Sequence, residues 1–161
     1  MLFRSVEQAV RSPDLAVVRA AEPKARELLR LATSNALPLD YWNYGNAVHY
    51  SHLLLGRYAL SFGDLLEARC RLLYAGDTPG SPQLCDYGPD MTLADELLAR
   101  GQSDTVLAYF GKCQVFWANK EKNRLLEWYV CVSEGTRPDF GKRSGLQRPS
   151  PTPVPPVRKA A

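Results

Sequence analysis

The sequence predicts an all-α domain followed by a flexible basic tail. No segment alternates apolar and polar residues clearly enough to demand a β-strand. The Leu- and Ala-rich runs place their apolar residues at helical spacing, and Ser, Asp, Pro and Gly separate these runs where helices usually begin and end. We expect one domain of six or seven antiparallel helices over residues 1–140 and a disordered Pro-rich tail over residues 141–161.

The positive charge of the chain is concentrated in the tail. The chain has 161 residues, enough to bury a sizeable core, and carries a formal charge of +3. The last 21 residues contain five basic residues and no acid, which leaves 15 of the 20 Lys and Arg against 17 Asp and Glu in the rest. The body is therefore slightly acidic, and we expect no nucleic acid partner.

The cysteines and the hydropathy pattern point to a cytoplasmic protein. Four cysteines (Cys70, Cys85, Cys113 and Cys131) are widely spaced, and we expect them to be small core residues in a reducing compartment. No apolar stretch approaches the roughly 20 residues that cross a membrane, and the first residues lack the apolar core of a signal peptide. We expect no membrane association.

Two prolines near the N-terminus predict two short helices. Ser12-Pro13 places a capping hydroxyl before a proline that suits the first helical position, and Glu22-Pro23 repeats the arrangement. An apolar stripe of Leu and Ala follows Pro23, and we expect a break near Asn35.

The next two helices are predicted around a Gly-Asp pair. An aromatic-rich segment over residues 41–62 predicts a longer helix that begins near Asp40 or Asn46. Gly63 suits the left-handed position after a helix, and Asp64 can accept hydrogen bonds from the free amides of the following one.

Residues 76–90 form an unusual connection with three prolines and three glycines. Such a length is uncommon between bundle helices, so the connection is either packed against the domain or functional. After it, Asp90 and Ser103 can cap two further helices, and Gly135 can close the last one.

The tail carries one specific pattern. Five prolines lie between positions 149 and 156, and residues 153–158 read PVPPVR, which fits a proline-helix ligand of SH3-like grooves. A solubilising or linker tail is the simpler interpretation.

An internal repeat explains the glycines inside helical runs. Residues 49–82 and 87–120 align with a constant offset of 38, with these pairs: Leu55 and Leu93, Gly56 and Ala94, Ala59 and Leu97, Gly63 and Gly101, Ala68 and Val106, Leu72 and Phe110, Ala75 and Cys113. This order of large and small residues resembles the tetratricopeptide repeat, a helix-turn-helix unit of 34 residues. By this resemblance, Gly56 allows close approach of the paired helix, and Gly63 and Gly101 turn the chain. The chain is also loosely similar to bacterial proteins of unassigned function.

The resemblance implies a concave surface that binds a protein or peptide. Carried over position by position, six residues would face that partner: Tyr50, Leu53, Arg57, Ser61, Met91 and Asp95. The Asn and basic residues with which some members clamp a chain end are largely missing. We therefore expect a non-enzymatic interaction module with no cofactor, no metal and no catalytic residue.

A small helical enzyme or ligand-binding protein is the alternative. His49 and His52 lie three residues apart, a spacing that could bind a metal if Cys85 or Asp86 supplied a further ligand. No CxxC or HExxH motif occurs, so packing beside the aromatic residues is the simpler role for both histidines. The aromatic residues could be binding anchors, but we interpret most of them as core, because aromatic side chains more often pack helices against one another. A cavity with converging polar groups around His49, His52 and the 76–90 loop would favour the alternative.

Overall fold

The computed structural model describes residues 2–34, 43–117 and 122–141, and over these ranges the chain forms eight α-helices and no strand. The helices are α1 (Leu2–Val10), α2 (Leu15–Thr33), α3 (Tyr44–Ser61), α4 (Leu65–Gly76), α5 (Pro82–Tyr87), α6 (Thr92–Leu98), α7 (Ser103–Trp117) and α8 (Lys122–Ser133). The all-α prediction is confirmed. Asn35, Tyr41, Trp42 and the predicted tail after Gly141 lie outside the described residues.

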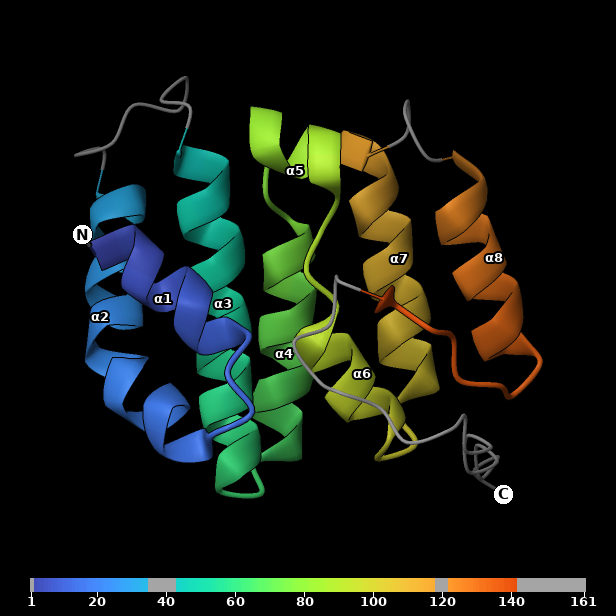
Figure 1. The fold of residues 1–161 in the computed structure, drawn as a ribbon, viewed down its shortest axis with the longest axis horizontal. Coiled ribbons are helices and arrows are strands. Elements are labelled where there is room, and N and C mark those ends of the chain that lie inside the picture. The colour runs from blue at the N-terminus through green and yellow to red at the C-terminus, as the bar shows by residue number, and fades with distance from the viewer. Residues whose placement is uncertain (1, 35–42, 118–121, 142–161) are drawn as a thin grey trace.

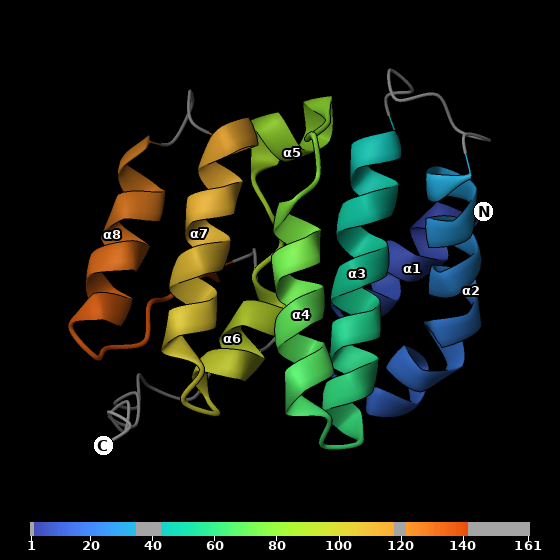
Figure 2. The same ribbon diagram turned by 180° about the vertical axis from the view of Figure 1, so that it is seen from behind.

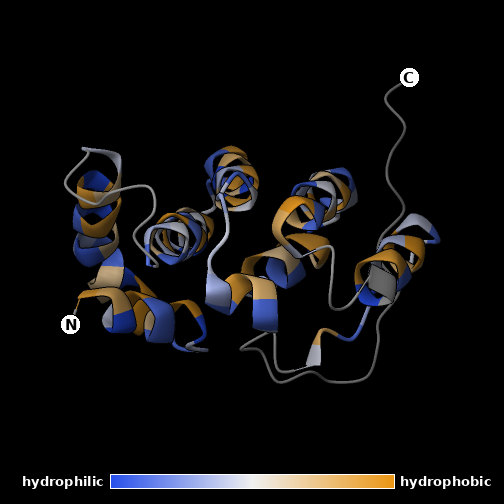
Figure 3. Ribbon diagram, turned by 90° about the horizontal axis from the view of Figure 1, so that it is seen from above, coloured by the Kyte–Doolittle hydropathy of each residue, from blue (hydrophilic) through white to orange (hydrophobic). Residues whose placement is uncertain are grey.

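Five long helices stand side by side in the order α2, α3, α4, α7, α8 (Figures 1 and 2). Helices α1 and α6 cross the front of this row, and α5 lies at its upper end. Seen from above, the long helices appear nearly end-on and the short ones lie along one side (Figure 3). The α3–α4 pair is the most extensive contact, followed by α2–α3. The front side therefore holds the short elements and the connections.

The N-terminal region differs from the prediction. Helix α1 precedes Ser12, and α2 is one continuous helix that contains Pro23, so the predicted helix start at Glu22-Pro23 is wrong. The buried residues of α2 repeat every three or four positions across the proline: Val18, Ala21, Ala25, Leu28 and Ala32. Packing of this stripe against α3 outweighs the roughly 3 kcal/mol that an interior proline costs. Asp14, not Ser12, caps α2 by accepting from the amide of Ala16 at 2.8 Å.

The predicted Gly-Asp boundary is confirmed. Gly63 has φ +80°, and the side chain of Asp64 accepts from the amide of Glu67 at 3.0 Å. Gly101 and Gly135 also have positive φ angles, after α6 and α8. Helix α3 begins at Tyr44, between the two predicted starts, and α7 begins at Ser103 itself.

The connection over residues 76–90 is packed against the domain and contains the unpredicted helix α5. Ser81 caps α5 by accepting from the amide of Leu84, and its hydroxyl donates to Asn46 Oδ1 at 2.6 Å. Leu84 is fully buried, and Gly88 lies so close to Trp117 that a side chain would not fit. These contacts fix the connection between α3 and α7.

Gly56 allows the close approach that the repeat predicts. A Cβ atom at this position would overlap Leu93 of α6 and lie 3.1 Å from Cβ of Arg71 on α4. Gly45 has the same role at the start of α3, because its Cβ would overlap the carbonyl oxygen of Gly80. Both glycines therefore bring α3 into contact with the segments in front of it or beside it.

Most aromatic residues of the C-terminal half pack together as predicted, whereas Tyr129 is exposed. Trp128 of α8 contacts Phe110, Trp117 and Phe140, with ring centroids 6.2, 5.9 and 5.0 Å apart. The prediction that the cysteines are core residues holds only for Cys113. Cys85 is exposed, Cys70 and Cys131 are half-buried, and all four are free thiols.

The structure shows packed helices and two antiparallel pairs, α3–α4 and α6–α7, but not a regular repeat array. The first helices of the two predicted units differ greatly, since α3 has 18 residues and α6 has 7. The difference arises because α5 and the turn after it occupy the residues that would extend α6 toward its N-terminus. Among the described helices, none combines the length and the apolar character required to cross a membrane.

Candidate functional site

The predicted binding residues lie on the front of the molecule, but most are covered. Tyr50, Leu53 and Arg57 on α3 and Met91 and Asp95 at α6 are buried. Ser61, at the end of α3, is half-buried. These residues contact other parts of this chain, so as arranged here they do not form the open surface that the resemblance implies.

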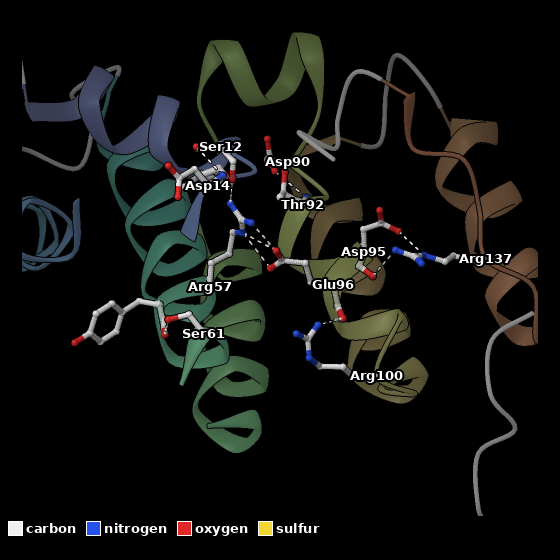
Figure 4. Close-up of polar contacts among 12 residues, drawn as sticks. Ser12, Asp14, Arg57, Ser61, Asp90, Thr92, Asp95, Glu96, Arg100 and Arg137 are labelled. Carbon is white, nitrogen blue, oxygen red and sulfur yellow. Dashed lines mark hydrogen bonds and ion pairs between the residues drawn. The ribbon is translucent and has the colours of Figure 1, made fainter. Parts of the chain in front are cut away.

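The turn between α1 and α2 covers Arg57 (Figure 4). Arg57 Nη1 donates to the carbonyl oxygens of Val10 at 2.8 Å and Ser12 at 2.7 Å. On its other side the guanidinium binds both carboxylate oxygens of Glu96, with Nε 3.0 Å from each. Arg57 is only 1% exposed, and this pairing with hydrogen bonds on both sides compensates its burial. Arg57 thus joins α3 to α6 and to the α1–α2 turn.

The segment after α8 covers Asp95. Arg137 Nε donates to Asp95 Oδ1 at 2.8 Å, and Arg137 Nη2 donates to the carbonyl oxygen of Asp95 at 3.1 Å (Figure 4). Asp95 is fully buried, so the guanidinium supplies both charge compensation and hydrogen bonds. Phe140, three residues further, packs on Trp128. This segment therefore contacts both α6 and α8 and links the two helices.

A second polar cluster surrounds Asp90, which lies just before α6. The Asp90 carboxylate accepts from Arg11 Nε at 2.8 Å and from the amide of Thr92 at 2.9 Å. Arg11 Nη2 also donates to the hydroxyl of Tyr50 at 3.0 Å, and the hydroxyl of Tyr109 donates to the carbonyl oxygen of Asp90 at 2.9 Å. The N-cap position of α6 is Met91, not the predicted Asp90, and it has no side-chain cap. Asp90 lies one residue earlier, and its carboxylate belongs to this larger network.

His49 is held within this cluster as a neutral side chain. The backbone amide of Asp90 donates to Nε2 at 3.2 Å, so Nε2 carries no proton, and Nδ1 then donates to the carbonyl oxygen of Ala75 at 3.0 Å. Burial lowers the pKa of His49 from 6.5 to about 4. Both ring nitrogens are therefore engaged in structural hydrogen bonds.

His52 faces α4. Its Nδ1 atom lies 3.2 Å from Nη1 of Arg71, and its ring contacts Tyr74 in a tilted arrangement with centroids 5.4 Å apart. Burial, and then the positive charge of Arg71, lowers its pKa to about 4. The two histidines thus have separate partners, and we find no group of three or more His, Cys, Asp or Glu within the described ranges that is arranged to hold a metal ion.

Two pockets open on either side of the α1–α2 turn. The upper pocket has a volume of about 220 Å³ and is lined by the following residues: Arg11, Tyr50, Gln83, Tyr87, Gly88, Pro89 and Asp90. The lower pocket has a volume of about 310 Å³ and is lined by Pro13, Leu15, Arg57, Leu60, Ser61, Glu96 and Arg100. Arg11 lines the upper pocket and Pro13 lines the lower one, so the two pockets flank the same turn. We call the two together the front groove.

The front groove combines rigid polar groups with accessible apolar ones. Tyr50, Arg57 and Asp90 are held by the hydrogen bonds described above. Tyr87, on the rim of the upper pocket, is 73% exposed, and Leu15, on the rim of the lower one, is 41% exposed. A third pocket of about 430 Å³ lies between α1 and α2 and is lined mainly by small side chains. None of these three pockets is lined by His49, His52, Cys85 or Asp86.

Comparison of the chain with protein-family models, with curated proteins and with solved structures gave no match. Fold and site together therefore define the molecule only as an all-helical protein with eight helices in its described residues and a groove on one side.

Sequence reasoning identified three residues that line the front groove, Tyr50, Arg57 and Ser61. It missed Arg11 and Glu96, whose partners lie 79 and 39 residues away in the chain. No local signal marks such pairs. The Pro- and Gly-rich connection did carry a signal for the upper pocket, because Gln83, Tyr87, Gly88 and Pro89 belong to it.

Proposed function

We propose that this chain is a non-enzymatic docking module that binds a protein or peptide segment in the front groove. The observation that carries the proposal is the pairing of accessible apolar groups, Tyr87 and Leu15, with rigidly held polar groups on one side of the molecule. Such a combination is characteristic of protein-binding surfaces, in which aromatic and apolar anchors contact a partner and fixed polar groups determine its orientation.

A tetratricopeptide-like origin of the groove is part of this proposal. The two antiparallel helix pairs, the close approach at Gly56 and the turns at Gly63 and Gly101 support it. The partner would then meet the first helices of the pairs from the front, at the places that α1 and the segment after α8 leave open.

An enzyme or ligand site around His49 and His52 has less support. Both ring nitrogens of His49 hold the fold together, and His52 is directed toward α4. Burial also raises the pKa of the Cys113 thiol, which keeps this buried cysteine protonated and therefore a poor nucleophile.

Three charge-introducing variants test the docking site. Tyr87→Asp and Leu15→Asp alter exposed side chains of the front groove, and Val115→Asp alters a side chain on α7 that is 83% exposed and lines none of the three pockets. Each full-length variant would be used to capture proteins from cells of the source organism. We expect each groove variant to capture less of the partner than the unchanged chain, by a factor of about ten or more. Val115→Asp should capture the same amount as the unchanged chain. Loss of the partner only with Val115→Asp would place docking elsewhere and overturn the proposal.

A further inference from the structure

The lower pocket of the front groove has an excess of positive charge at its rim. Arg19 donates through Nε to the hydroxyl of Ser61 at 3.1 Å and through Nη2 to the carbonyl oxygen of Ser61 at 2.8 Å. Its guanidinium also lies 4.4 Å from the ring centroid of Phe62. On the other side of the pocket, Arg100 Nη1 donates to the carbonyl oxygen of Glu96 at 2.9 Å. Both guanidinium groups are therefore positioned by neutral acceptors.

No carboxylate compensates these two arginines within the part of the chain that the structure describes. Glu96 pairs with Arg57, Glu22 pairs with Arg26, and Asp14 caps α2. Asp14 also lies at the N-terminus of a 19-residue helix, where the macrodipole amounts to roughly half a positive charge and offsets part of its negative charge. The pocket thus retains net positive charge from Arg19 and Arg100.

The lower pocket also has an apolar part next to its polar and charged lining. Pro13 and Leu15 form one side, and Leu60 lies at its base. Two arginines beside this apolar part complement a carboxylate that has an apolar group next to it. A volume of about 310 Å³ is at the lower end of the range of small ligand sites, so it suits one or two side chains of a longer segment.

We propose that the lower pocket recognises an acidic side chain flanked by apolar residues in the partner's segment. The carboxylate of the partner binds between Arg100 and Arg19, and its apolar neighbours contact Leu15 and Leu60. Charge-assisted hydrogen bonds to guanidinium groups that are already positioned favour this arrangement, because little side-chain freedom is lost on binding. This assignment rests on the proposed docking function and names the chemistry of its partner.

A matched pair of peptides tests the assignment without altering the protein. The probes are acetyl-Leu-Asp-Leu-amide and acetyl-Leu-Asn-Leu-amide, titrated into the isotope-labelled full chain and followed by the amide resonances of Leu15, Ser61 and Arg100. We expect the Asp peptide to shift these resonances and to bind at least about fivefold more tightly than the Asn peptide, which has the same shape but no charge. Equal affinity of the two peptides, absence of binding at millimolar concentration, or shifts confined to other residues would overturn the assignment.

Two variants identify the cations responsible. Arg19→Gln and Arg100→Gln should each weaken binding of the Asp peptide about threefold or more and leave the Asn peptide unaffected. The matched control is Arg30→Gln, at the far end of α2, where Arg30 pairs with Glu27 on the surface. Equal binding by all three variants would show that the pocket cations do not bind the carboxylate.

The outcomes separate this inference from the docking proposal. If the Asp and Asn peptides bind equally well and Leu15→Asp still abolishes binding of the cellular partner, the docking proposal stands and the proposed acidic preference is wrong. If Leu15→Asp and Tyr87→Asp both retain the partner, the docking proposal falls whether or not the peptide binds.

Discussion

Gly56 and Gly111 both lie inside helices, but their surroundings are opposite. A Cβ at Gly56 would overlap Leu93 in the core, whereas a Cβ at Gly111 would lie in open space beyond the backbone of its own helix. Alanine is favoured over glycine by about 1 kcal/mol in a helix interior. We therefore expect Gly111→Ala to raise the free energy of unfolding by about 0.5–1 kcal/mol. Gly56→Ala should lower it by about 1–2 kcal/mol, because overpacking exceeds the helix gain.

Urea unfolding of the two variants, followed by tryptophan fluorescence, measures this difference. Each variant is the control for the other, since both changes add the same methyl group to a helix. A stability gain in both variants would mean that α6 can move away from α3 without cost, and the close approach would lose its structural role.

His49 makes the stability of the fold depend on pH. Its pKa is about 4 in the folded chain and near 6.5 when unfolded, so between these values the unfolded state binds a proton that the folded state does not. The contribution is therefore complete above pH 6.5 and is lost as the pH falls toward 4, by on the order of 3 kcal/mol for this buried group. His52 acts in the same direction.

Urea unfolding of the full chain at a series of pH values between 4 and 7 checks this dependence. In His49→Gln the curve of unfolding free energy against pH should be shallower, by up to about 1.4 kcal/mol per pH unit, because one titrating group is removed. An unchanged curve would show that His49 is not the buried neutral group described above. His52→Gln, examined alongside, separates the contribution of the more exposed ring.

At the scale of elements, α2 shows that packing can dominate a local signal. Pro23 is exposed, removes one helical hydrogen bond donor, and yet lies within a continuous helix. We expect Pro23→Ala to raise the free energy of unfolding by about 1–3 kcal/mol, less the entropy that proline removes from the unfolded chain. Thermal unfolding would show a higher midpoint temperature. A lower midpoint would mean that a proline-induced bend is needed for α2 to fit α3.

The elements that the sequence predicted correctly are those with signals at their ends. Gly63 and Asp64 mark a boundary through backbone conformation and capping, both of which depend only on neighbouring residues. Helix α5 was missed because its six residues are too few to show a period, and its position depends on Asn46 and Trp117.

The candidate site shows the same division between local and distant causes. The repeat resemblance selected Tyr50 and Arg57 on α3, and the two residues line the front groove. It could not show that residues 10–12 and residue 137 cover this side of α3 and its neighbour α6, because such contacts join segments distant in the chain. The face that the resemblance implied for a partner is therefore largely covered by other segments of the same chain.

At the scale of the whole molecule, the last described segment should decide where the folded domain ends. Ending the chain at Gly135 removes Arg137 from the buried carboxylate of Asp95 and Phe140 from the ring of Trp128. Removing one partner of a buried ion pair costs about 3–5 kcal/mol, a large part of the 5–15 kcal/mol that stabilises a typical domain. We expect this truncation to unfold at a much lower urea concentration or to fail to fold.

Ending the chain at Gly141 is the matched truncation, because it removes only the part in which the composition predicts no packing. It should change the free energy of unfolding by less than about 0.5 kcal/mol. The full-length variants Arg137→Ala and Phe140→Ala keep the comparison informative if the shorter truncation does not fold, and each should lose at least about 2 kcal/mol. Similar stability of both truncations would show that Arg137 and Phe140 do not hold α6 to α8. A large loss on ending at Gly141 would instead show that the domain extends into the basic tail.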